Sequence, residues 1–552
     1  MTTYTASPTS IASRYETMTG DREWPLARSR EAAAYTLPWV CPDDDHVTRN
    51  SDDPIKYAAN QAVGGRLTQG LVAQIVQLLL PYQASLFTYN VAPKYQGNTS
   101  RLSRQQREAF ETMLRTRAEA ICNLIHSQSA APNRGRRSGT VLAATTALVA
   151  QKLITGNACW RIDDEGAITV FPLANWVVHR DSMGDILCLI VKERINPLEL
   201  SQEQQAAIAA NKPGEWKDLQ AKDSAYDRLR DVYHKMEWDT TSQRWRVTSE
   251  CMGVQIADMT DPTPPYWCSA DNLMPGEHYG NSLVGIALPD LRTIDELTIA
   301  MRDHAAMAAF CVMAVDYQSS ANEARLKALQ PREITRLSVR GGQVDDVALF
   351  SPTNVPSFQV SKDSLDRTVQ AMSQFFLEPG GMVRESERTT ALEVARVTLQ
   401  QLQNSLGVLI QTLTEQYSPH LVRRYERIAE KMGVVPQFTQ EMRDMLALRM
   451  KTGAAALADQ QGATQLITYI DIETKLAQQE IPSHIDRRAV SMQLAKHFHI
   501  DTSIIFSREE QQRLERERQQ AAITQQSQID ANRITAEGAR DLVLQQAGIA
   551  AA

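Results

Sequence analysis

The feature that most constrains the fold is a long amphipathic helix predicted over residues 390–433. Thr390 and Glu393 match a capping box, the side-chain pattern that begins many helices. Apolar residues then recur in alternating steps of three and four: Leu392, Ala395, Leu399, Leu402, Leu406, Leu409 and Leu413. This spacing places one apolar stripe along about six helical turns. Such a stripe is typical of a core helix or of a coiled coil, and the core is the commoner case.

The other face of this predicted helix is polar and carries Glu393, Arg396, Gln400 and Gln403. Gly407 and Pro419 are expected to bend the helix, because both residues weaken the backbone hydrogen-bond ladder. Directly upstream, Gly380 and Gly381 open a charged loop over residues 379–389 that carries Arg384, Glu385, Glu387 and Arg388. The loop is either a solvated connection or a functional element, and the residues alone leave both interpretations open.

The rest of the chain predicts a mainly α fold with β-rich insertions (α+β). Helices are expected at 70–80 and at 141–154, and Gly156 should end the second of these. A further helix is expected to begin after Ser103, because Ser103 and Gln106 match a capping box. Short β-rich runs fill 158–251, with one hairpin at "DSMGD" and a second within "VYHKMEWDTTSQRWRVT". The spacing then predicts a helix over 283–314, with Pro289 near its start, where proline is tolerated.

A hairpin is predicted in "RLSVRGGQVDDVALF", with its turn at Arg340, Gly341 and Gly342. A further helix is expected over 363–376. Beyond Pro436 the sequence predicts shorter helical pieces to about residue 505. A polar, glutamine-rich helix follows from Ser507, and it contains too few apolar residues to bury a core alone.

Composition excludes several classes of protein. The 552 residues carry 58 basic against 65 acidic side chains, a net charge of −7, so the chain as a whole lacks the positive footprint of a nucleic-acid binder. The seven cysteines are scattered and form no CxxC pair, which favours a reducing compartment. The N-terminus lacks the pattern of a secretory signal. The apolar run at 70–81 is too short to span a membrane.

No motif for catalysis or for cofactor binding is apparent. The P-loop, HExxH and GxSxG patterns are absent, and "VGGRLTQG" lacks the lysine of a nucleotide-binding loop. Two acidic runs, 43–45 and 163–165, could hold a cation but are more typical of solvated turns. The arginines of "NRGRR" at 133–137 could touch phosphate or simply form a surface loop. His497 and His499 lack the neighbouring ligands of a zinc site. We therefore expect no cofactor, no metal and no enzymatic activity.

Six segments in a fixed order resemble the portal, or head-to-tail connector, proteins of T7-like short-tailed bacteriophages. They are "AAAYTLPW" (32–39), "NQAVGGRLTQGLVAQIVQLLLPYQ" (60–83), "VVHRDSMGDIL" (177–187), "EHYGNSLVGIALPDLRTIDEL" (277–297), "RTTALEVARVTLQQLQNSLGVL" (388–409) and "HIDTSIIFSREEQQ" (499–512). None is a catalytic signature, so the resemblance rests on their collinearity over nearly the whole chain.

The resemblance implies a subunit with named regions. Residues 1–282 would form the wing, 283–314 and 362–378 the two stem helices, and 315–361 the clip. The loop 379–389 would be the tunnel loop, followed by the channel helix 390–433, the crown 434–506 and a polar tail 507–552 that could form a barrel. These borders are expectations carried over from the family.

The resemblance also implies a function and partners. Twelve copies would form a ring at one vertex of the capsid, through which double-stranded DNA is packaged and ejected. Partners would be the terminase large subunit, scaffolding and major capsid proteins, tail adaptors and internal core proteins, with no membrane. The protein would be made in the bacterial cytoplasm and end in the virion. We hypothesise that the mixed charges at 384–388 prevent tight DNA binding.

Two rival functions remain open at the level of sequence. A metal-dependent nuclease could use carboxylates of the acidic turns, if distant segments brought them together. Another structural virion component, such as an internal core protein, is the second alternative, although the single short apolar run argues against a protein that enters membranes.

Overall fold

The structure is a computed structural model of the 552-residue chain, which divides into two compact units, Met1–Ala454 and Ala455–Ala552. It describes residues 10–41, 59–80, 86–91, 94, 104–128, 140–309, 312–315, 339–340, 343–344, 347–350, 355–378 and 391–451, all in the first unit. In the strands between 312 and 350, and in the long helix before Gln411, the description covers the backbone only. Within these ranges no helix has the length and apolarity needed to cross a bilayer.

Helix α5 (Val141–Thr155) is the centre of the core. It is buried on nearly every side, as expected for a helix with apolar residues around its whole circumference. Helices α1 (Ile11–Ala34), α2 (Val63–Leu79), α4 (Arg104–Gln128) and α9 (Leu283–Ala309) contact it. The predictions of α2 as a buried helix, of α4 as an amphipathic helix beside α5, and of Gly156 as the end of α5 are confirmed.

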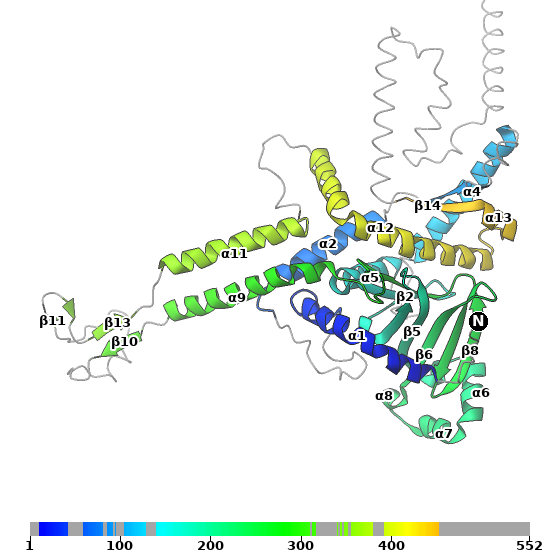
Figure 1. The fold of residues 1–552 in the computed structure, drawn as a ribbon, viewed down its shortest axis with the longest axis horizontal. Helices are drawn as coiled ribbons and strands as arrows, with labels where there is room; N and C mark the ends of the chain where they lie inside the picture. The colour runs from blue at the N-terminus through cyan, green and yellow to red at the C-terminus, as the bar shows by residue number, and fades with distance from the viewer. Residues whose placement is uncertain are drawn as a thin grey trace, which may run out of the picture. The chain divides into compact units, whose positions relative to one another are not determined.

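Two antiparallel sheets make up the β-rich region. One contains β2 (Asn157–Ile162) between β3 (Ile168–Phe171) and β9 (Tyr266–Ala270). The other has five strands in chain order: β4 (Trp176–Arg180), β5 (Ile186–Ile195), β6 (Arg230–Asp239), β7 (Arg244–Cys251) and β8 (Val254–Asp261). Both predicted hairpins are confirmed as β4–β5 and β6–β7. Helix α1 lies against this sheet (Figure 1) and contacts β4 and β6.

The sequence did not predict the segment between β5 and β6. It contains the short 3-10 helix η3 (Pro197–Glu199) and helices α6 (Gln202–Asn211), α7 (Pro213–Ala221) and α8 (Ala225–Arg228). Ile208, Trp216 and Leu219 form a small separate core with Val232 and Cys251 of the sheet. A full capping box at Ser201 and Gln204 begins α6, so a local signal was present.

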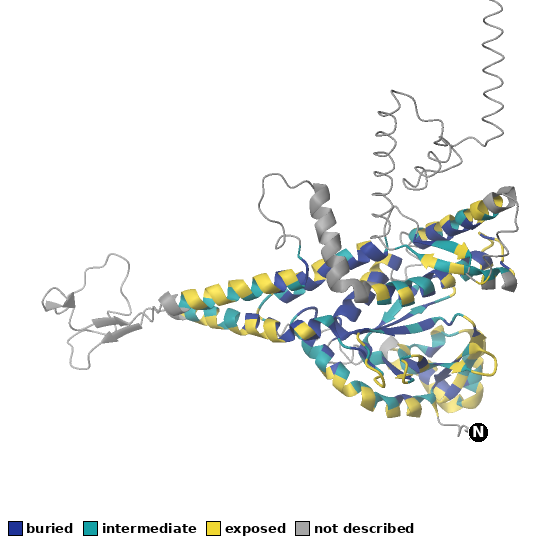
Figure 2. Cartoon of the chain, turned by 45° about the horizontal axis from the view of Figure 1, so that its top comes forward, coloured by how far each residue is buried: buried dark blue, intermediate teal, exposed yellow. Residues whose placement is uncertain are grey.

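Helices α9 and α11 (Val355–Phe375) pack side by side (Figure 1). Their burial is greatest where α9 begins and α11 ends, around Val284, Leu291 and Phe376, and decreases along the pair (Figure 2). The prediction that α9 reaches residue 314 is wrong, because the helix ends at Ala309 and β10 (Val312–Val315) follows. Helix α11 also begins earlier than predicted, at Val355.

The predicted hairpin in 336–350 is correct in its turn and wrong in its extent. Strands β11 (Val339–Arg340) and β12 (Gln343–Val344) pair antiparallel across a two-residue connection. The run that was expected to lengthen this hairpin is instead β13 (Val347–Phe350), which pairs with β10. The valines of β10 and the valine and phenylalanine of β13 favour extended backbone. The strand that pairs with β13 is therefore not the nearest β-rich run in the sequence.

Helix α12 (Ala391–Lys431) is the longest helix within the described ranges, and Figure 1 draws it with a bend. Short helix α13 (Gln440–Met445) and strand β14 (Leu446–Met450) follow it. The expectation of only helical pieces here is wrong, because "LALRM" alternates in burial and pairs with β1 (Phe87–Val91). Residues 434–450, predicted as part of the crown, therefore pack within the first unit.

Candidate nucleic-acid interface

The residues predicted to face DNA fall mainly outside the part of the structure that can be described in side-chain detail. The loop residues Arg384, Glu385, Glu387 and Arg388 lie outside the described residues, as do Gly341 and Gly342. The predicted polar face, Glu393, Arg396, Gln400 and Gln403, lies within helix α12, as do Gly407 and Pro419. Arg340 ends strand β11. The assignment of these residues to a channel, and of the bend to Gly407 and Pro419, stays a prediction.

The structure does show what holds the segment before the predicted loop. Helix α11 ends in a Schellman motif: the backbone N–H of Glu378 donates to the Ser373 carbonyl, and that of Leu377 donates to the Gln374 carbonyl. Leu377 occupies the left-handed position with φ 56°, where glycine is usual. Its side chain and that of Phe376 are nonetheless buried. Burial of the side chain offsets the backbone cost.

A second set of contacts fixes the same turn through its polar groups. Ser373 donates to the Glu378 carboxylate, which also pairs with Arg66 of α2. Gln74 of α2 approaches the Leu377 carbonyl at 3.5 Å. The chain that enters the predicted tunnel loop is therefore attached to α2 rather than free to follow the loop.

On the other side of the loop, the described half of α12 is anchored by one buried face. Leu413, Tyr417, Leu421, Tyr425 and Ile428 follow steps of three and four residues and are almost fully buried. The hydroxyls of Tyr417 and Thr145 are 2.7 Å apart, and Tyr425 donates to the Gly166 carbonyl. Burial raises the pKa of Tyr417 to about 12, so this hydroxyl stays neutral.

His420 adds a buried polar contact next to Pro419. Its Nδ1 accepts a hydrogen bond from the Trp160 indole N–H, while its Nε2 lies 2.8 Å from the Pro264 carbonyl and must donate. The ring also stacks on Trp267. Burial lowers the pKa of His420 to about 4, because the charged form would lose its hydration. A neutral imidazole of one tautomer therefore joins α12 to the three-stranded sheet.

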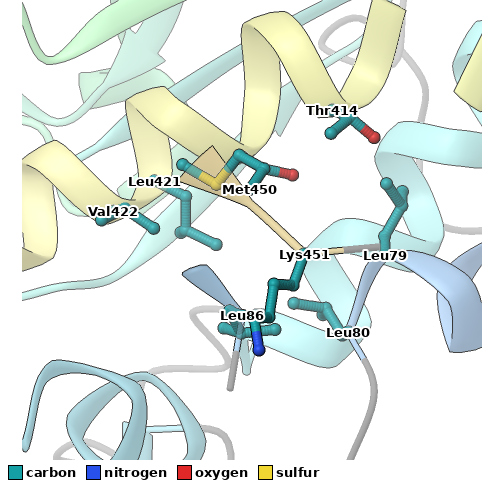
Figure 3. A pocket seen from close by; sticks show the side chains of 9 residues that line it. Leu79, Leu80, Leu86, Thr414, Leu421, Val422, Met450 and Lys451 are labelled. Carbon is teal, nitrogen blue, oxygen red and sulfur yellow. The ribbon is translucent and has the colours of Figure 1, made fainter. Parts of the chain in front are cut away.

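A small cavity lies beneath the same part of α12. It has a volume of about 10 Å³, enough for no more than about one water molecule. Figure 3 shows leucines of α2 and α12, Met450 of β14 and the Thr414 hydroxyl around it. Its size excludes a ligand site, and it marks the junction where α12, α2 and β14 meet.

The acidic turn at 163–165 contacts the end of α12. Asp163 accepts from the backbone N–H groups of Glu165 and Ala167 and so closes the β2–β3 turn. Asp164 pairs with Arg424 at 2.8 Å and with Lys431 at 2.7 Å, and these contacts hold the pKa of its carboxyl below the usual range. The turn thus binds α12, whereas the sequence analysis favoured solvated carboxylates and did not predict these ion pairs. The run at 43–45 lies outside the described residues.

Arg117 of α4 forms the most buried ionic contact of α12. Its guanidinium pairs with Glu426 and Glu430, donates to the Pro436 carbonyl and lies 3.6 Å from the centre of the Phe438 ring. Arg443 of α13 pairs with the other oxygen of Glu430. Sequence reasoning missed this cluster, although an arginine between Leu114 and Ile121 on the apolar face of a helix was a usable signal.

A second buried pair connects three elements near the start of α9. Lys152 of α5 lies 3.0 Å from Asp271, which follows β9, and donates to the Ser269 hydroxyl. The Thr412 side chain of α12 lowers the pKa of the same carboxyl, as does Lys152. Burial raises the pKa of Asp271 to about 6 despite the nearby lysine. No group of three or more His, Cys, Asp or Glu side chains suited to a metal occurs within the described ranges.

The geometry is therefore that of a long helix fixed at many points, without a reaction centre in the part of the chain that is described. A family model of bacteriophage head to tail connecting proteins matches residues 8–505. This chain belongs to that family. The predicted resemblance is thereby confirmed, and with it the non-enzymatic assignment, because head-to-tail connectors are structural proteins. The nuclease alternative and the internal core protein are set aside.

Three curated relatives of this connector are portal proteins. That of Enterobacteria phage T3 is 25% identical, over 90% of this chain and 88% of its own length. That of Escherichia phage T7 is 24% identical over the same shares, 90% and 88%. That of Pseudomonas phage phiKMV is 22% identical over 95% of this chain and 96% of its own. The family places the connector at the junction of head and tail in the phage particle.

Proposed function

We propose that copies of this connector form a ring, with twelve subunits, at one vertex of the capsid and that double-stranded DNA passes through it. The family and the portal names of its relatives support this proposal. The observation that carries it is the anchoring of the chain before residue 379 and of α12 from Leu413 onward. Leu377 and Glu378 are held by the end of α11 and by α2, and α12 is held from Leu413 onward.

In this proposal, the loop 379–389 is the tunnel loop and the polar face of α12 lies towards the channel. Anchored flanks would let the loop contact moving DNA while the rest of the subunit stays fixed. Arg384 and Arg388 balance Glu385 and Glu387, so the loop neutralises few phosphates. Each phosphate that a protein neutralises increases its affinity for DNA and the salt dependence of binding. A loop that binds DNA weakly therefore lets the DNA move through the channel.

The remaining regions would contact other proteins of the particle. Strands β10 to β13, with the turn at Arg340, Gly341 and Gly342, form the proposed clip for the terminase large subunit and later for tail adaptors. Scaffolding proteins, major capsid proteins and internal core proteins would be further partners. Synthesis in the bacterial cytoplasm and assembly into the virion complete the proposal.

The test reverses the charge of the loop. Glu385→Lys with Glu387→Lys in assembled particles should slow DNA packaging or ejection and make both steps more sensitive to salt. Glu203→Lys with Glu215→Lys is the matched control, because it makes the same charge change at exposed positions of α6 and α7. Unaltered DNA transport in the loop variant, or equal slowing in the control, would contradict the proposed role.

A further inference from the structure

Two cysteines of the three-stranded sheet face each other across the ladder between β2 and β9. Cys159 of β2 is directly opposite Cys268 of β9, and both are free thiols that are almost fully buried. Side chains directly opposite each other on antiparallel strands point to the same face of the sheet. The two other cysteines in the described strands, Cys188 and Cys251, have no cysteine opposite them.

The hydrogen bonds of this ladder define the geometry of the cysteine pair. The Ile162 N–H donates to the Pro265 carbonyl at 2.9 Å, and the Asp271 N–H donates to the Gly156 carbonyl at 2.8 Å. Opposite residues on antiparallel strands alternate between hydrogen-bonded and non-hydrogen-bonded pairs. The cysteine pair lies three positions from each of these two bonded pairs, so it is a non-hydrogen-bonded pair.

Non-hydrogen-bonded pairs bring two antiparallel strands closest together. Their Cα atoms are about 4.5 Å apart, and the Cβ atoms of opposite residues are about 4.5–5.5 Å apart. A disulfide requires Cα atoms roughly 4.4–6.8 Å apart and Cβ atoms roughly 3.5–4.5 Å apart. The backbone at the cysteine pair therefore suits a disulfide, and closure requires only a small approach of the two side chains.

The surroundings of the two thiols differ in charge. Arg180 of β4 donates to the Cys268 sulfur at 3.5 Å. Burial raises the pKa of Cys268, but the positive charges of Arg180 and Lys152 oppose this effect. Burial also raises the pKa of Cys159, and there the Glu193 carboxylate acts in the same direction as burial. Cys268 is therefore the thiol that forms a thiolate more readily, and the thiolate is the reactive form of cysteine.

Buried cysteines often serve only as small apolar side chains. That role accounts for the burial of this pair. It requires neither two thiols opposite each other where the strands are closest nor a guanidinium group beside one of them.

We propose that Cys159 and Cys268 are a redox pair that closes a cross-strand disulfide when hydrogen peroxide reaches the sheet. Cys268 is the nucleophile and Cys159 is the resolving thiol. The oxidant must be a molecule of this small size, because almost no surface of either side chain is exposed. The pair follows from the contacts of a single chain and does not depend on the proposed channel.

The reaction has two steps. The Cys268 thiolate attacks one oxygen of the peroxide, the O–O bond breaks, and the departing hydroxide takes up a proton to form water. The sulfur of Cys159 then attacks the sulfur of the Cys268 sulfenic acid, the S–O bond breaks, and a second water molecule leaves. Two thiols and one peroxide thus become one disulfide and two water molecules.

The disulfide would strengthen the sheet to which α12 is attached. Trp160 and Trp267, which are the neighbours of the two cysteines along β2 and β9, both contact His420 of α12. A bond between residues so far apart in the chain also restricts the unfolded state. The protein would keep free thiols in a reducing compartment and gain the cross-link in an oxidising one.

The experiment maps the disulfides of the purified full chain after the folded protein has been treated with hydrogen peroxide. Remaining thiols are alkylated in denaturant, and an aspartate-specific protease separates Cys251 from Cys268 by cleavage at Asp258. Cys188→Ala is the matched control, because it removes a buried cysteine that faces no other cysteine. Cys159→Ala removes the resolving thiol, and protein treated in denaturant shows whether pairing depends on the fold.

In the parent and in Cys188→Ala, Cys159 and Cys268 should be linked in most chains, and dithiothreitol should reverse the link. The linked parent should have a thermal midpoint at least about 2 °C above that of the reduced parent. In Cys159→Ala the midpoint should not rise, and dimedone should trap a sulfenic acid at Cys268.

The disulfide map of the parent decides the proposal even if Cys159→Ala does not fold. Alkylated thiols at both positions after peroxide treatment would overturn the proposal, as would over-oxidation of Cys268 without a disulfide. A link that forms only in the unfolded protein would also overturn it. A linked protein without a higher midpoint would contradict the stabilising role.

Discussion

Lys152 Nζ lies 3.0 Å from Asp271 Oδ1, and both side chains are almost fully buried. The pair joins the centre of the core to the chain that leads into α9, because the backbone of Asp271 also exchanges hydrogen bonds with Gly156 and Asn281. A buried ion pair contributes little net stability over apolar residues of similar size, but removing one partner leaves an uncompensated charge. The pair therefore makes a clear prediction.

Lys152→Met should destabilise the protein by about 3–5 kcal/mol at pH 8, whereas Lys152→Met with Asp271→Leu should be far less harmful. In the single variant the pKa of Asp271 rises further, well above its unfolded value. A raised pKa in the folded state means that stability is gained as pH falls, so the defect should shrink between pH 8 and pH 5. Denaturant unfolding at the two pH values measures this, and a defect independent of pH would contradict the assignment.

His420 predicts a loss of stability in mild acid. Its pKa is about 4 in the folded protein, against an ordinary value of 6.5, so the unfolded chain binds the proton first as pH falls. The contribution of the neutral imidazole is present above pH 6.5 and is lost towards pH 4, by up to about 3 kcal/mol.

His420→Gln tests this directly. The variant should be less stable than the parent at pH 8, and the difference between them should narrow from pH 6.5 to pH 4, as followed by denaturant unfolding. His234, with a pKa of about 3, stays in both proteins and cancels in the comparison. A constant difference over this range would show that His420 does not titrate as its burial implies.

Leu377 predicts an unusual order of substitutions. Leu377→Ala removes the buried side chain and keeps the left-handed strain, while Leu377→Gly removes both. Leu377→Gly should therefore be more stable than Leu377→Ala, by about 1 kcal/mol. Met372, buried within α11, is the matched position, where alanine should be better than glycine by a similar amount. The thermal unfolding midpoints of the four variants measure this order. If the alanine variant were more stable than the glycine variant at both positions, the left-handed strain at Leu377 would be refuted.

Gly156 predicts a severe steric effect. A Cβ atom there would lie 2.5 Å from the Asn281 carbonyl carbon, and the residue has φ 72°, so neither space nor backbone allows a side chain. Gly156→Ala should destabilise by more than about 3 kcal/mol or prevent folding. Gly20→Ala is the control, because nothing lies within 4 Å of its position in α1 and alanine should stabilise by about 0.5–1 kcal/mol. Expression yield and thermal midpoint distinguish the two, and a well-folded Gly156→Ala protein would be the contrary result.

The elements predicted correctly from sequence are those whose signals are local. The i, i+3, i+4 pattern was sufficient for α4 and α12, and the turn residues were sufficient for the β4–β5 hairpin. A continuous apolar run was sufficient to predict α2, although this helix begins at Val63 and not near Gly70. The incorrect predictions concern strands whose pairing partners lie far away in the chain. Strand β14 exists because it pairs with β1, and β13 because it pairs with β10. Propensity alone cannot identify such partners.

At the candidate site, too, local features could be predicted and contacts between distant segments could not. The approximate position of the long helix could be predicted, but its anchors could not, because Arg117, Asp164 and Trp160 come from separate elements. Arg117 and Lys152 each interrupt the apolar face of a helix, and such residues are the signal that a buried pair exists. The identity of the partner carboxylate required the fold.

We propose above that copies of this chain form a ring with a channel for DNA. The most direct test is electron-microscope class averaging of the purified protein, combined with its mass in solution. We expect closed rings with a central hole wide enough for duplex DNA and a mass close to that of twelve subunits. A compact monomer or dimer at every concentration and salt would contradict it.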